Sequence, residues 1–94
     1  MARTALDKIH ALNAMIESLD GDIGQARAEL GMLEHIDADA QRDAAVTEHA
    51  EDRQDARMTA SDVARITKHI DKLLSMRAKT TRKRDASLAK LQAG

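Results

Sequence analysis

The chain has 94 residues, carries a net charge of −1 and contains no Phe, Trp, Tyr, Pro or Cys. This length predicts one domain, and the lack of aromatic residues argues against a thick globular core, because aromatic side chains usually supply much of the burial there. Charged residues make up 33% of the chain, which together with its many alanine and leucine residues is typical of long helices and coiled coils.

The sequence carries no sign of export or membrane insertion. Its N-terminus lacks the uninterrupted apolar region of a signal peptide, and no run approaches the roughly 20 apolar residues that span a bilayer. Without cysteine, the chain can form neither a disulfide nor a thiolate metal site. We therefore expect a cytoplasmic protein with no membrane partner and no cofactor.

Charge is distributed unevenly along the chain. Residues 1–57 contain six Lys/Arg and thirteen Asp/Glu, whereas residues 58–94 contain nine Lys/Arg and three Asp/Glu. This asymmetry predicts that the two parts attract each other, or that the second part binds an acidic partner.

The first predicted element is a helix over residues 4–36. Thr4 and Asp7 have the spacing of a capping box, with Asp in place of the usual Glu or Gln. From Ala2 onward, apolar residues alternate in steps of three and four, which is the heptad pattern of a coiled coil. With Ile9 at heptad position a, the large residues at positions a and d, which form the predicted seam, are Ile9, Leu12, Ile16, Leu19, Ile23, Leu30 and Leu33.

Three glycines interrupt this helix without shifting its pattern. Gly21, Gly24 and Gly31 fall at the outward-facing positions f and b, and the seam keeps its phase across them. A turn at Asp20–Asp22 would preserve that phase only by chance. We therefore favour one continuous helix over two, although each interior glycine costs up to about 1 kcal/mol relative to alanine.

Residues 37–58 form an acidic segment with little apolar material to bury. Asp37 occupies an a position, and Val46 is the single large aliphatic residue between positions 37 and 57. The pattern predicts that the seam fails here. The segment is expected to be an exposed helix, a bend or a connector.

A second helix is predicted over residues 59–92. Thr59 and Asp62 repeat the spacing of the first capping box. The large apolar residues that follow at seam spacing are Val63, Ile66, Ile70 and Leu73.

The apolar stripe of this second helix weakens toward its end. The positions that would continue the heptad register hold Arg77, Thr80, Arg84 and Ser87. We therefore predict that the register is lost and that the apolar face drifts toward an eleven-residue period. The residues that this drift would place nearer one side are Val63, Ile66, Ile70, Leu74, Ala78, Thr81 and Leu88.

Two helices of nearly equal predicted length, opposite charge and matching caps predict an all-α fold, an antiparallel coiled-coil hairpin with the acidic segment at its tip. A parallel dimer is the alternative, because Ile at a and Leu at d is the preference of parallel two-stranded coiled coils. Leu6 at e and Met15 at g widen the apolar stripe beyond a two-stranded seam. This widening favours self-association into a helical bundle.

The candidates for metal binding and catalysis are few. Asp7 and His10 have a carboxylate–histidine spacing, but both face away from the predicted seam. The pairs Glu34–His35 and Glu48–His49 lie where no packing would fix the three or four ligands that a zinc site needs. The chain has no Cys nucleophile, Gly-rich phosphate loop or recognisable catalytic triad. We predict no metal site and no catalytic residue.

A basic cluster near the C-terminus is the strongest candidate for phosphate contacts, and it consists of Arg77, Lys79, Arg82, Lys83 and Arg84. On a helix these residues spread around the axis, and the chain has no aromatic side chain to stack on bases. The seam positions of Arg77 and Arg84 also leave open a small helical enzyme with inward cations.

Taken together, these patterns predict a non-enzymatic structural protein. We expect it to associate with itself, as a dimer or larger, and to present a helical surface to an unidentified protein partner. A nucleic-acid-binding accessory protein is the second reading of the sequence, and a small helical enzyme is the third.

Overall fold

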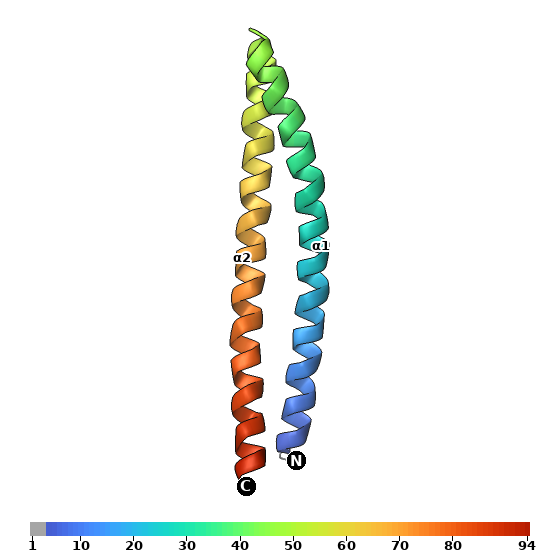
Figure 1. Ribbon diagram of the computed structural model, residues 1–94, viewed down its shortest axis with the longest axis vertical. Helices are drawn as coiled ribbons and strands as arrows, with labels where there is room; N and C mark the ends of the chain where they lie inside the picture. Colours follow the sequence, from blue (N-terminus) through green and yellow to red (C-terminus); the bar gives the residue numbers. More distant parts are fainter. Residues whose placement is uncertain (1–3) are drawn as a thin grey trace. The chain divides into compact units, whose positions relative to one another are not determined.

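The computed structural model describes residues 4–94 as two α-helices with no strand in that range. α1 is Ala5–Val46 and α2 is Ala50–Ala93, joined by residues 47–49 (Figure 1). The chain is thus an all-α helical hairpin, as predicted. Ala2, with which the predicted seam begins, lies outside the described residues.

The start of α1 is capped as its sequence predicts. Thr4 Oγ1 accepts a hydrogen bond from the backbone N–H of Asp7 at 3.1 Å, and Asp7 places a negative charge in the first turn, where the helix dipole favours it. α1 then passes through Gly21, Gly24 and Gly31 as one helix. The predicted continuity across these glycines is confirmed.

The helices are longer than predicted, since α1 continues past residue 36 to Val46 and α2 begins at Ala50 rather than at residue 59. The acidic segment is therefore helical on both sides of a three-residue connection. Its alanines have the highest helix propensity, and Glu51 and Asp52 complement the dipole in the first turn of α2.

The second capping box is wrong, because Thr59 and Asp62 lie inside α2. The Thr59 hydroxyl instead donates a hydrogen bond to Asp37 Oδ1 at 2.7 Å. A residue type that favours helix starts is thus used here for a contact between the helices.

The chain divides into two compact units. Unit 1 consists of the described residues of Met1–Ile23 together with Lys72–Gly94, and unit 2 is Gly24–Asp71. Each unit pairs a segment of α1 with a segment of α2.

Within each unit, later residues of α2 contact earlier residues of α1. In unit 1, Arg77 bonds to Asp20 and Arg84 bonds to Asn13. In unit 2, the Gln41 side chain bonds to the carbonyl of Ala56 and Thr59 bonds to Asp37. This order of contacts is the one expected of an antiparallel hairpin.

The core of unit 1 follows the predicted seam of α1 and buries Ile9, Leu12, Ile16, Leu19 and Ile23. From α2, Leu73 and Thr80 are buried, while Arg77, Arg84 and Ser87 are half-buried. The heptad register of α2 therefore continues through the polar residues.

The predicted drift to an eleven-residue period is confirmed only in part, since Leu74 and Ala78 are exposed whereas Thr81 and Leu88 are half-buried. The heptad register of α2 continues because the polar residues at its seam positions can pack there without leaving their polar groups unpaired. The Thr80 hydroxyl donates to the carbonyl of Met76 at 2.9 Å, and long arginine stems can cover apolar surface while their charged ends reach outward.

Unit 2 buries fewer large side chains along the same register. Ala26, Ala56, Ile66 and Ile70 are buried. The remaining predicted seam residues of this unit are half-buried, and they are Leu30, Leu33 and Val63. The predicted failure of the seam after residue 36 is also wrong, because the next a and d positions of α1 stay half-buried, at Asp37, Ala40 and Ala44.

The three glycines inside α1 generate a prediction. A Cβ atom added at Gly21, Gly24 or Gly31 would meet no atom within 4 Å. Each replacement by alanine should therefore raise the free energy of unfolding by about 0.5–1 kcal/mol, measured by thermal melting in circular dichroism. The control Ala14→Gly, at an exposed position of the same helix, should lower it similarly. A lower melting temperature for the alanine variants would contradict the unbroken helix.

Candidate interaction surfaces

A polar contact occupies the seam of unit 2. Asp37 stands at an a position, and its Oδ1 accepts hydrogen bonds from Gln41 Nε2 at 2.9 Å and from the Thr59 hydroxyl at 2.7 Å. These donors hold the pKa of Asp37 below its usual value, with Gln41 the larger cause and Thr59 the second. Gln41 also donates to the carbonyl of Ala56 at 2.8 Å, so it ties both helices of the unit together.

A second polar contact joins the helices of unit 1. The Arg77 guanidinium binds the Asp20 carboxylate through two hydrogen bonds, one from Nε and one from Nη2 to Oδ2 at 3.3 Å. The hydrogen bonds lower the pKa of Asp20 and raise that of Arg77. Two turns further along the seam, Arg84 Nη1 donates to Asn13 Oδ1 at 3.2 Å.

The predicted phosphate-binding cluster is thus divided by the fold. Arg77 and Arg84 lie on the seam and bind α1. Lys79, Arg82 and Lys83 are exposed and form no ion pair with any residue in the range 4–94. The predicted attraction between the acidic and basic parts of the chain consists, among the described residues, of one ion pair between the helices, Arg77 with Asp20.

Two lysines that were not predicted as site residues, Lys8 and Lys90, line the same groove as Lys83. A shallow groove of about 500 Å³ in unit 1 has Lys8, Lys83 and Lys90 in its lining. Its apolar lining comes from Ala11, Leu12, Met15 and Ala86. We call this surface the basic groove. All three lysines occupy heptad position g, a signal that becomes visible once the register of α2 is continued past Leu74.

Unit 2 contains a shallow groove of opposite charge, with a volume of about 360 Å³. Its apolar lining comes from Ile36, Ala40 and Met58. The carboxylates in its lining are Asp39, Asp43, Asp55 and Asp62. We call this surface the acidic groove. Three of its carboxylates, Asp43, Asp55 and Asp62, occupy position g in the registers of their helices.

The two grooves match the net charges of their units. Unit 1 contains nine Lys/Arg and five Asp/Glu, a net charge of +4. Unit 2 contains six Lys/Arg and eleven Asp/Glu, a net charge of −5. The near-neutral chain is therefore built from one basic and one acidic unit.

Large apolar side chains flank the seam on both helices. Five residues at positions e and g are 39–52% exposed, and they are Leu6, Met15, Ile36, Leu74 and Met76. Positions e and g of a two-stranded coiled coil usually carry charged residues. Here these five positions carry large apolar side chains instead.

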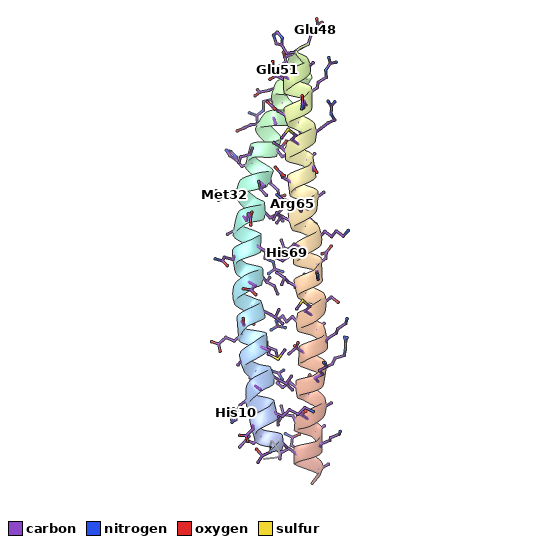
Figure 2. All side chains as sticks on the ribbon, turned by 180° about the vertical axis from the view of Figure 1, so that it is seen from behind. His10, Met32, Glu48, Glu51, Arg65 and His69 are labelled. Atoms are coloured by element: carbon purple, nitrogen blue, oxygen red, sulfur yellow. The ribbon has the colours of Figure 1, made fainter. Side chains whose placement is uncertain are left out.

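The candidate metal ligands are not brought together. His10 is exposed and points away from α2 (Figure 2). Within residues 4–94, no three His, Asp or Glu side chains are grouped closely enough to hold a metal ion. Neither helix, over the same residues, contains an apolar stretch that could cross a membrane.

Comparison with known proteins found no match to a family model, a curated protein or a solved structure.

The polar seam of unit 2 predicts a specific dependence of stability on pH. Because the pKa of Asp37 is lowered on folding, the stabilisation by its charged form is complete above the ordinary aspartate pKa of about 3.9. It is lost as the pH falls below that value and through the lower folded pKa. Asp37→Asn should therefore lose less stability than the wild type between pH 5 and pH 2, as measured by urea unfolding.

Asp71→Asn is the matched control, because Asp71 is exposed and lies off the seam. It should follow the wild-type curve. If Asp37→Asn also follows that curve, the contacts of Asp37 do not stabilise the fold.

Proposed function

We propose that this chain is a non-enzymatic structural protein that associates with itself and presents a helical surface to a protein partner. It would act as an antiparallel hairpin that assembles into a bundle, and the cytoplasm is the location we propose for it. The order of contacts within each unit supports the antiparallel arrangement.

One observation carries this proposal. The apolar flank residues at positions e and g, among them Leu6 and Met15, are exposed on helices whose a and d positions already face each other. Exposed apolar side chains beside a filled seam favour burial against another helix. Association would supply apolar burial that a pair of helices without aromatic residues lacks.

The seam arginines support a non-enzymatic role over the small helical enzyme. Arg77 and Arg84 are the inward cations that such an enzyme would use to hold an anionic substrate. Both are engaged by α1, through Asp20 and Asn13. A substrate would have to displace these partners.

The proposal predicts a mass above that of one chain. Light scattering at micromolar concentration should give a multiple of 10.3 kDa. The triple variant Leu6→Gln, Met15→Gln and Met76→Gln should shift the mass toward the monomer, because it makes three of the four apolar flank residues of unit 1 polar. The control Met32→Gln, at a 69% exposed position away from the flanks, should leave the mass unchanged. A cooperatively melting wild-type monomer would contradict self-association.

The nucleic-acid alternative is favoured by one observation, the exposure of Lys79 and Arg82 without an ion pair among the described residues. We expect wild type and Lys79→Gln/Arg82→Gln to melt within about 0.5 kcal/mol of each other, as surface substitutions usually do. We also expect neither protein to shift duplex DNA in a gel at low salt. A wild-type shift that the variant loses would instead support DNA binding, since phosphate contacts are strongest under those conditions.

A further inference from the structure

We infer that the basic groove of one copy binds the acidic groove of a second copy. This inference rests on the proposed self-association and specifies the two surfaces that carry it. The occupant of each groove is thus the opposite unit of another identical chain.

Both grooves expose large apolar side chains in their lining. Met15 in the basic groove is 52% exposed, and Ile36 and Met58 in the acidic groove are 49% and 57% exposed. Burial of these side chains against one another removes apolar surface from water on both copies. Methionine is unbranched and polarizable, so Met15 and Met58 can adapt to fill gaps between two shallow surfaces.

The charged lining decides which grooves pair. Lys8, Lys83 and Lys90 form no ion pair with residues 4–94, and neither do Asp43 and Asp55. Two basic grooves or two acidic grooves would repel each other, whereas a basic groove and an acidic groove attract. The complementarity therefore selects unit 1 against unit 2 and disfavours like against like.

The other two carboxylates of the acidic groove have partners on their own helix. Asp39 lies 3.4 Å from Arg42 Nη1 and 3.9 Å from His35 Nε2, and Asp62 lies 3.3 Å from Arg65 Nη2. These are exposed pairs three or four residues apart, of a kind that contributes little to stability. They leave both carboxylates able to reorient toward a lysine of another copy.

The heptad positions of these residues support the same pairing. The lysines of the basic groove and three of the aspartates of the acidic groove stand at position g, where charges set partner choice and orientation in coiled coils. Four helix segments would then meet at each contact, as in a bundle.

A charge-swap experiment on the full chain tests this pairing. The basic-groove variant carries Lys8→Glu, Lys83→Glu and Lys90→Glu, and the acidic-groove variant carries Asp43→Lys, Asp55→Lys and Asp62→Lys. Each alone has two grooves of like charge, so its self-dissociation constant should rise by at least about tenfold. An equimolar mixture should associate again, because each groove then meets one of opposite charge. The control variant carries Lys72→Glu, Lys79→Glu and Arg82→Glu, which change the same amount of charge outside the groove lining.

Analytical ultracentrifugation of the separate and mixed proteins gives the readout, and circular dichroism checks that each stays helical. Recovery of association only in the mixture, with the control close to wild type, supports the pairing. Variants that associate as well as wild type, or a mixture that stays monomeric, would overturn it while leaving self-association intact. A wild-type protein that stays monomeric would overturn the proposed function itself. If that monomer binds anionic lipid vesicles, the basic groove would instead be assigned to a membrane surface.

If a triple variant loses its helical signal, the single changes Lys83→Glu and Asp43→Lys replace it. Both positions are exposed, where a single substitution usually has little effect on stability. As for the triple variants, each single change alone should weaken association, and an equimolar mixture of the two single variants should restore it. Absence of that recovery counts against the pairing.

Discussion

The heptad phase shared by α1 and α2 is the constraint on which the rest of this structure depends. From Ile9 to Ala44 in α1 and from Asp52 to Ser87 in α2, every residue at position a or d is buried or half-buried, whatever its chemistry. In unit 1 this places the large aliphatic residues of α1 against a stretch of α2 that contains Arg77, Thr80 and Arg84. The phase holds because each polar residue finds a partner: Asp20 for Arg77, and a backbone carbonyl for Thr80.

The same constraint shapes the surfaces available for function. Since the seam is occupied by a and d positions, the residues left at its edges stand at e and g. These positions carry exposed apolar side chains on both helices, with lysines in unit 1 and aspartates in unit 2. Among residues 4–94, one ion pair joins the two helices, between Arg77 and Asp20. The lysines and aspartates at the edges are therefore available to select a partner. The proposed assembly follows from this edge composition.

Much of the fold could be predicted from spacing alone. The Thr4 cap, the continuous first helix and the aliphatic seam follow from local chemistry and a fixed period. The errors all arose where polar residues stand at seam positions, because a hydrophobic pattern cannot show that Asp37 will meet Thr59 or that Arg77 will meet Asp20. Such partners are distant in sequence and come together only in the folded pair.

The basic groove could not be predicted, because we expected the heptad register of α2 to be lost after Leu74. Lys83 and Lys90 are recognisable as g residues only when that register is continued. Cysteine cross-linking tests the pairing register of the two helices, because the chain contains no native cysteine. In Asp37→Cys/Thr59→Cys we expect rapid formation of a disulfide within one chain under mild oxidation, and slow formation in Asp37→Cys/Met58→Cys. Cross-links only between chains, or equal rates for both variants, would contradict it.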